Sequence, residues 1–357
     1  MARCQRLLVA VLLGGTLLAC GDGGGGPGAA PRSYFMGFSA IPPRPDTAIL
    51  VPTLTLAAQH SDAGLIQLGI PWQVLLDGTS PAVEVGVVRL PLVNYYRGQG
   101  MKVVVTLDVT DGLDRAAEAP ELVAANRSIT DSAVQRLYRE YVGAVDSILS
   151  PDYLSLAAET NLIRLAAPAP LYAAVVAMVN DAARELSAAG SGTPLMVSVQ
   201  VETAWGRLQG GTTYVGIAQD RADFPFLMAL GLSSYPYLGG FGDPDSVPLD
   251  FYSRLVVGAS LPLIVLEGGW PSVPAGPVTS TPAKQAKYIA RQSRILDSAG
   301  AAGLFQITFT DLDLSAIPLP PGSILTLFAH LGLVDSALQA KPALATWDSV
   351  LARPYRP

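Results

Sequence analysis

Short apolar runs alternate with longer segments of helical periodicity along the chain from Tyr34 onward. The short runs are rich in Val, Ile, Leu and Phe, and several have no polar interruption, as expected of strands covered on both faces. We expect strands over residues 34–39, 64–70, 102–107, 153–158, 195–201, 226–233, 263–266 and 303–309. Helical spacing is clearest over 131–149, 170–188 and 282–298, and it is weaker after the second and fifth strands.

Eight strands, each followed by a crossover segment, indicate an α/β protein built around a parallel sheet. The count fits a single-domain (β/α)8 barrel over residues 32–357, although a doubly wound open sheet would give a similar pattern. We favour the barrel because polar residues gather where the strands end, and barrels of this type build their sites at the carboxyl ends of the strands.

The first residues form a region of their own. Arg3 and Arg6 precede thirteen uncharged residues, 7–19. As a helix this run would reach roughly 20 Å, short of the roughly 30 Å hydrocarbon core of a bilayer. We therefore interpret residues 1–19 as a cleaved export signal.

The end of this signal, Leu17-Leu18-Ala19-Cys20, resembles the bacterial lipobox. The resemblance implies that Cys20 is lipidated and that the protein is a lipoprotein anchored in the cell envelope, at the outer membrane or cell surface. The glycine-rich residues 20–31 would then form a flexible tether. An ordinary signal peptide with an incidental cysteine is the alternative.

Composition and charge narrow the range of possible functions. The formal net charge is −6, and it becomes more negative once Arg3 and Arg6 are removed, which argues against nucleic acid as a partner. Cys4 lies in the signal and Cys20 would be lipidated, so no thiol is left for a disulfide or a metal site. We expect no cofactor, no metal and a monomer.

Two strands end in a carboxylate. The fourth strand runs into Glu159, and the seventh runs into Glu267. These strands lie on different sides of an eight-stranded ring, so the two side chains can face one another across a cleft above its axis. Retaining glycoside hydrolysis needs such a pair, with carboxyls about 5–5.5 Å apart.

The motifs around these glutamates resemble the clan A glycoside hydrolases. Glu-Gly-Gly-Trp-Pro-Ser at 267–272 is similar to the nucleophile turn of endo-β-1,4-galactanases and β-1,3-glucanases. The segment 232–237 is similar to the strand whose tyrosine, here Tyr235, bonds the nucleophile. The resemblance implies Glu159 as general acid/base, Glu267 as nucleophile and Tyr235 as the residue that orients Glu267.

The sequence departs from that family at two positions. The family has Asn directly before the acid/base glutamate, where this chain has Ala158. Asn161 is our candidate to replace it as a substrate-binding residue. On the eighth strand, Phe309 is the candidate for the sugar-binding place where the family commonly has tryptophan.

Other residues are assigned to the substrate only by their position after strands. Trp72, Asp108, Trp205 and Trp270 follow the second, third, fifth and seventh strands, and aromatic faces and carboxylates suit a glycan cleft. The three tryptophans fit simple packing as well. For Glu159, a structural ion pair with Arg164 is the alternative.

Together these patterns predict a retaining glycoside hydrolase that acts on a β-linked poly- or oligosaccharide. The alternative is a catalytically inactive barrel lipoprotein that binds glycans at the cell surface, for which Ala158 is the main support. The sequence does not name the sugar or the linkage, nor whether cleavage is endo or exo.

Overall fold

A computed structural model describes residues 30–208, 210–317, 319 and 322–357. The expected export signal, the lipidation site Cys20 and nearly all of the expected tether lie outside these residues. No helix among the described residues is both long and apolar enough to cross a membrane.

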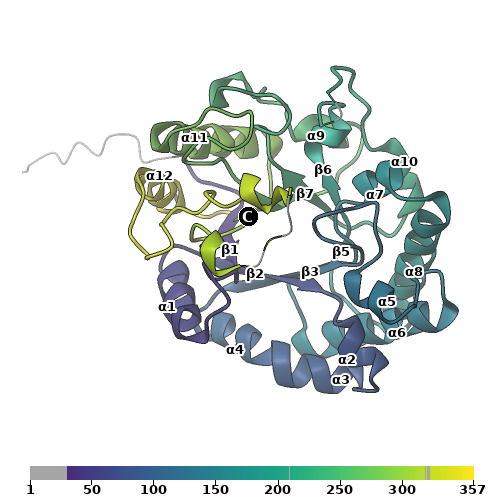
Figure 1. Ribbon diagram of the computed structural model, residues 1–357. Helices are drawn as coiled ribbons and strands as arrows, with labels where there is room; N and C mark the ends of the chain where they lie inside the picture. The colour runs from purple at the N-terminus through teal and green to yellow at the C-terminus, as the bar shows by residue number, and fades with distance from the viewer. Residues whose placement is uncertain (1–29, 209, 318, 320–321) are drawn as a thin grey trace, which may run out of the picture.

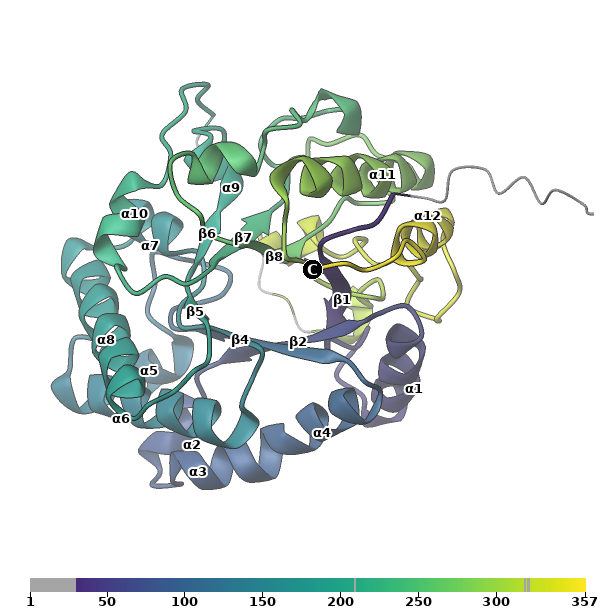
Figure 2. The same ribbon diagram turned by 180° about the vertical axis from the view of Figure 1, so that it is seen from behind.

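The core of the protein is a closed ring of parallel strands (Figures 1 and 2). The strands are β1 Phe35–Ser39, β2 Ala63–Gly69, β3 Lys102–Asp108, β4 Tyr153–Ser155, β5 Leu195–Met196, β6 Ser198–Gln200, β7 Leu230–Ser234, β8 Leu263–Gly268 and β9 Gly303–Gln306. Their order in the sheet is β5-β4-β3-β2-β1-β9-β8-β7-β6, and every pairing is parallel.

The expected fifth strand is split at Val197 into β5, which pairs with β4, and β6, which pairs with β7. One short segment therefore joins both ends of the sheet and closes it. The expected (β/α)8 barrel is confirmed, and the open doubly wound sheet is excluded.

An outer ring of helices covers the strands (Figures 1 and 2). The α-helices are α1 Thr47–Ala58, α2 Trp72–Leu76, α3 Pro81–Glu84, α4 Leu90–Gly98, α5 Pro120–Ala124, α6 Ser132–Ala144, α7 Thr160–Ala166, α8 Ala169–Ala188, α9 Val201–Ala204, α10 Ala218–Asp223, α11 Pro282–Ala299 and α12 Pro342–Leu351. The three helices that the sequence predicts most clearly correspond to α6, α8 and α11. The first of them ends in a π-helical turn, Val145–Leu149.

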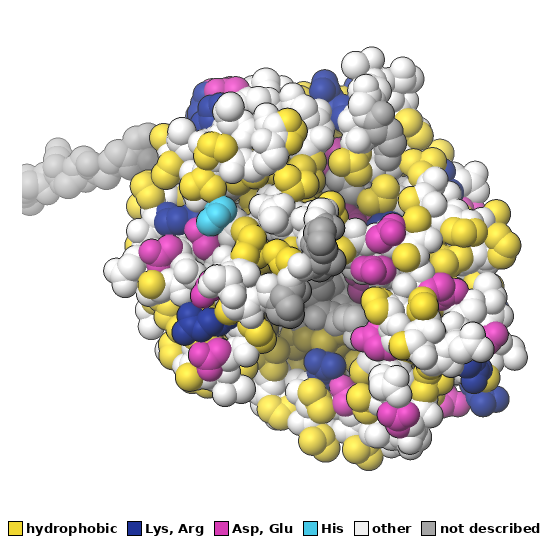
Figure 3. Space-filling model, viewed as in Figure 1, with side chains coloured by type: hydrophobic (Ala, Val, Ile, Leu, Met, Phe, Trp, Pro, Cys, Tyr) yellow, Lys and Arg dark blue, Asp and Glu magenta, His cyan; other side chains and the backbone are white. Residues whose placement is uncertain are grey.

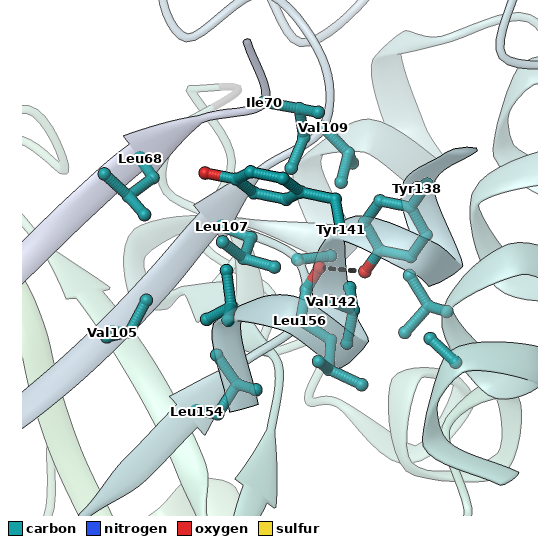
Figure 4. Packing of buried hydrophobic residues seen from close by; sticks show 14 of the residues in the cluster. Leu68, Ile70, Val105, Leu107, Val109, Tyr138, Tyr141, Val142, Leu154 and Leu156 are labelled. Atoms are coloured by element: carbon teal, nitrogen blue, oxygen red, sulfur yellow. Dashed lines mark hydrogen bonds between the residues drawn. The ribbon is translucent and has the colours of Figure 1, made fainter. Parts of the chain in front are cut away.

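Side chains that alternate along the strands fill two different spaces. One set points into the barrel and forms a single hydrophobic cluster. Its members are Phe35, Ala63, Leu65, Val104, Met196, Ala229, Ile264, Leu266 and Phe305. The other set points outward against the helices. Figure 4 shows this outer packing between β3, β4 and α6, where the buried Tyr138 hydroxyl donates to the Leu156 carbonyl at 2.6 Å. The filled lumen leaves only the ends of the barrel for a binding site.

Two arginines join the chain ends at the amino end of the strands. Arg32 is buried, pairs with Asp62 at 2.5 Å and donates to the carbonyl of Leu351. Arg353 donates to the carbonyls of Ala30 and Pro31, each at 2.8 Å. The first described residues are therefore held against this end of the barrel.

Candidate active site

A cavity of about 860 Å³ lies at the carboxyl ends of the strands. Figure 3 shows a hollow near the middle of this face, with hydrophobic side chains in and around it. Glu159 and Glu267 both line the cavity, together with Tyr235 and Asp108. The structure thus brings together four residues that the sequence predicts for the site.

Strand alternation explains which side chains reach the cavity floor. Leu65 on β2 and Val104 on β3 point into the lumen. Gln67 lies two residues after Leu65, and Asp108 lies four after Val104, so both point the same way one layer higher. Both line the cavity.

Glu159 is held in an unusual backbone conformation between β4 and α7. Its φ and ψ are 49° and 45°, in the left-handed region that non-glycine residues rarely adopt. Its backbone N–H donates to the Ser198 hydroxyl at 2.9 Å. A strained residue persists only where the surrounding structure offsets the strain, and such residues cluster at functional sites.

The Glu159 carboxylate is buried and has two donors. Arg115 Nε donates to Oε2 at 2.9 Å, and the Ser233 hydroxyl donates to Oε1 at 2.5 Å. Its ion-pair partner is therefore Arg115, whereas Arg164 pairs with Asp220 at 3.0 Å. The suggested pair between Glu159 and Arg164 is wrong.

Glu267 reaches the cavity because β8 is irregular. Leu232 pairs with Val265 but the next residue, Ser233, pairs with Glu267, so Leu266 is the extra residue of a bulge. Such a bulge redirects the side chains that follow it. Leu266 and Glu267 can in this way both face inward.

The residue after Glu267 must be glycine for a steric reason. A Cβ on Gly268 would lie 2.5 Å from the Ser234 carbonyl oxygen of β7. The Glu-Gly sequence therefore reflects a close approach of two strands next to the carboxylate.

The surroundings of Glu267 raise its pKa into the neutral range. Burial, and then the charge of Glu159, raise the pKa of Glu267 to about 7, against smaller opposing effects of Ser233, Arg115 and Gln67. Gln67 Nε2 donates to Oε2 of Glu267 at 3.0 Å. Ser233, which also bonds Glu159, lies between the two carboxyls.

Arg115 supplies the positive charge of the site. Its guanidinium is 6% exposed and also donates to Asp108 at 2.5 Å. Burial would lower the pKa of Arg115, but Asp108 and Glu159 raise it above its ordinary value. Arg115 therefore stays charged and links Asp108 to Glu159.

A third glutamate lies behind this pair. Glu202, at the start of α9, is fully buried and contacts Gln200 and the Ser234 hydroxyl. Burial raises the pKa of Glu202 to about 8, despite backbone and Ser234 hydrogen bonds that lower it. Glu202 does not line the cavity; Gln200, its neighbour, does.

Tyr235 lines the cavity beside the carboxyls. Burial, and next the charge of Glu267, raise the pKa of Tyr235 well above its usual value. Its ring packs edge-on against Phe328, with centroids 4.9 Å apart. Among the described residues no hydrogen bond joins the Tyr235 hydroxyl to Glu267, so its orienting role stays a prediction.

The tryptophans expected to bind substrate are packed elsewhere. Trp72 and Trp270 are fully buried, and Trp270 Nε1 donates to the Ser280 hydroxyl at 3.0 Å. Trp205 stacks on Phe251 with centroids 5.2 Å apart. None of the three tryptophans lines the cavity. Their positions fit the alternative that they serve in packing.

The two residues proposed to compensate for missing family features also have other partners. Both ends of the Asn161 amide bond the backbone of Gln200, at 2.8 and 2.9 Å, so Asn161 joins α7 to β6. Phe309 is fully buried and packs edge-on against Phe38 at 4.9 Å. Neither side chain lines the cavity, so the structure offers no support for binding roles.

Sequence reasoning missed several cavity residues. Arg115 lies in the irregular segment after β3, and its only signal was a single arginine among Asp108, Asp111 and Asp114. Gln67 and Gln200 were hidden inside expected strands. Phe328 and the apolar residues near it lie in a segment without clear periodicity.

No group of three or more His, Cys, Asp or Glu residues in the described part of the chain could hold a metal ion.

Comparisons with known proteins show the same fold. No protein-family model matches the sequence, and no curated protein matches it. Among solved structures, a β-glucosidase from Exiguobacterium marinum aligns with a TM-score of 0.63 and 9% identity over 90% of this chain and 99% of its own. An exo-β-1,4-mannosidase from Opitutaceae bacterium strain TAV5 aligns with a TM-score of 0.61 and 15% identity over 90% of this chain.

This chain spans 59% of the length of the mannosidase. A structure described as fungal β-1,4-galactanases aligns with a TM-score of 0.53 and 18% identity over 82% of this chain and 89% of its own. At these identities the likeness establishes the (β/α)8 fold, and the function must be argued from the site.

Proposed function

We propose that the protein is a retaining glycoside hydrolase of clan A that cleaves β-linked glycosides, with Glu159 and Glu267 as its catalytic pair. The observation that carries the proposal is that two carboxyls, one following β4 and one at the carboxyl end of β8, line one cavity, with the Ser233 hydroxyl bonded to Glu159 and next to Glu267. The structural neighbours named as glycosidases support it, because their fold places a site at the same end of the barrel.

In this mechanism one carboxylate attacks the anomeric carbon and the other carboxyl protonates the leaving oxygen. Water then hydrolyses the glycosyl-enzyme, and the second group acts as the base. Both groups must share one proton near neutral pH, and mutual repulsion between buried carboxyls arranges this. The raised pKa of Glu267 supports such sharing.

We assign Glu159 as general acid/base and Glu267 as nucleophile from their strand positions. Burial and the charge of Glu159 raise the pKa of Glu267 into the neutral range, so the substrate-free pair can hold one proton near pH 7. The assignment requires this proton to be on Glu159 when a sugar binds. Positive charge that develops at the anomeric carbon in the transition state would favour ionised Glu267. The Ser233 hydroxyl, next to both carboxyls, offers a short path for the proton between them.

The first experiment is hydrolysis of β-linked galactan, glucan, mannan and xylan, with the matching aryl β-glycosides, by the purified protein and by Glu267→Gln. We expect one sugar to be released by the parent and the variant to lose at least about a thousandfold in kcat/KM. Glu121→Gln on the outer helix α5 is the matched control and should keep full activity.

Rescue by azide separates the two roles. Glu159→Ala should retain activity on aryl glycosides with good leaving groups and yield the β-glycosyl azide, whereas Glu267→Ala should yield the α-azide. The reverse pattern would exchange the roles. A parent that binds a glycan and releases no sugar from any substrate would instead identify a catalytically silent glycan-binding barrel.

A further inference from the structure

The cavity changes character between its floor and its mouth. Strand ends supply a polar floor that includes Gln67, Glu159 and Glu267. The loops and short helices above the strands supply aliphatic walls, among them Ile41, Leu113, Leu162, Leu238, Ile324 and Leu325. Arg44 and Asp114 are the charged residues of the described wall.

These walls suit hydrocarbon better than sugar. Sugar rings are bound by flat aromatic faces and by partners for each hydroxyl, and an unpartnered buried hydroxyl costs about 1–3 kcal/mol. The only aromatic residues in the described lining are Tyr235 and Phe328, which pack edge-on against each other. A large apolar surface left inside a hollow indicates an apolar ligand.

The direction of the ligand follows from the barrel. The lumen below the carboxyls is filled by Phe35, Leu266 and Phe305, among other side chains. A sugar seated at the carboxyls can therefore extend only outward, between the aliphatic walls. In an exo-acting enzyme the group on the outward side is the leaving group, and we adopt this orientation for the substrate.

We infer that the substrates are glycosides whose leaving group carries a long alkyl chain, with the sugar at the strand ends and the chain along the apolar walls. This inference rests on the proposed function. The bond between the anomeric carbon and the leaving oxygen breaks, the acid/base residue supplies the proton of the released alcohol, and one water supplies the hydroxyl of the released sugar.

The test is a homologous series from methyl to dodecyl β-glycosides of the sugar that the protein hydrolyses, each below its micelle concentration. We expect kcat/KM to rise with chain length, by up to about fourfold for each fully buried methylene, until the walls are covered. A flat series, or a preference for the polymeric glycan, overturns the inference and leaves the glycosidase intact.

Wall variants locate the effect. Leu113→Ser and Ile324→Ser replace side chains that are 46% and 43% exposed, so neither change should unfold the protein. Each should lower the ratio of dodecyl to methyl kcat/KM by about threefold or more. Leu249→Ser, at 45% exposure outside the cavity, is the matched control and should leave the ratio unchanged.

A protein that hydrolyses no glycoside would contradict the proposed function. The chain-length dependence is then measured by calorimetry, as binding of methyl to dodecyl β-galactosides, β-glucosides, β-mannosides and β-xylosides to the parent protein. Affinity that rises with chain length and falls in Leu113→Ser supports the apolar walls as the binding surface. Equal affinity for methyl and dodecyl glycosides overturns the inference.

Discussion

Arg115 joins the polar groups of the cavity floor into one network. It pairs with Asp108 and Glu159, and all three side chains are largely excluded from solvent. A buried pair that loses one partner leaves an uncompensated charge, which costs about 3–5 kcal/mol. Arg115 therefore contributes to the stability of the fold and holds the Glu159 carboxylate in position.

We predict that Arg115→Met lowers kcat/KM by about a hundredfold or more and lowers the melting temperature. The matched control is Arg164→Met, which breaks the Arg164–Asp220 pair outside the cavity. The control should lose stability and keep its kcat/KM. Equal activity losses in the two variants would show that Arg115 acts only through folding.

Glu202 contributes to the pH dependence of stability. Its folded-state pKa of about 8 lies above the ordinary value of 4.5 for a glutamate. The folded state therefore holds this proton more tightly than the unfolded chain, and the resulting stability is present below pH 4.5 and is lost as the pH rises through 8.

We predict that Glu202→Gln, which cannot ionise, removes this loss. Between pH 4.5 and 7 the free energy of unfolding of the variant should gain about 3 kcal/mol relative to the parent. Urea unfolding of both proteins across this range measures the difference. A constant difference would contradict a raised pKa at Glu202.

At the scale of elements, the turn after β8 fixes Glu267. The bulge at Leu266 and the close approach of Gly268 to Ser234 leave no room for a side chain. We predict that Gly268→Ala costs about 1–3 kcal/mol in stability and lowers kcat/KM, because β8 must shift beside Glu267.

The control for this change is Gly143→Ala in helix α6, where a Cβ meets no atom within 4 Å. Alanine should stabilise this helix by about 0.5–1 kcal/mol and leave activity unchanged. Thermal melts and kinetics of both variants check the prediction. Unchanged activity in Gly268→Ala would contradict the argument that this turn positions Glu267.

Elements with strong periodicity were the ones that the sequence predicted well. α8 and α11 match their expected ranges closely, because one face of each is buried against the barrel. The split at Val197 has no local signal, since it arises from pairing with β4 on one side and β7 on the other. The helices after β2 were underestimated because their apolar residues lie on exposed as well as buried faces, as at Val87 and Val88.

The candidate site was predicted where it depends on strands and missed where it depends on loops. Glu267 lies near the carboxyl end of β8, and Glu159 lies four residues after the short strand β4, where the sequence predicted a longer strand. A barrel brings such strand-end positions together. Arg115 and Phe328 reach the cavity through irregular segments, whose paths depend on tertiary packing. Trp270 was assigned to the substrate from its position after the seventh strand, yet it is fully buried in the core.

At the scale of the whole molecule, we propose that Cys20 anchors the protein to a membrane. We predict that Cys20→Ser moves the protein from the membrane fraction to the soluble fraction and abolishes metabolic labelling with palmitate. Cys4→Ser is the control and should change neither. A Cys20→Ser protein that stays in the membrane fraction would show that another part of the chain anchors it.

The two arginines at the chain ends determine which side of such an anchored protein would face the membrane. Arg353 and Arg32 hold Ala30 to Arg32 against the pole opposite the cavity. If residues 20–29 form the expected flexible tether, its root-mean-square end-to-end distance is roughly 17 Å. The mouth would then open away from the bilayer that holds the lipid. Such an enzyme would act on glycosides that arrive from the medium or from a facing surface. It would not reach glycosides in the leaflet that holds its own lipid anchor.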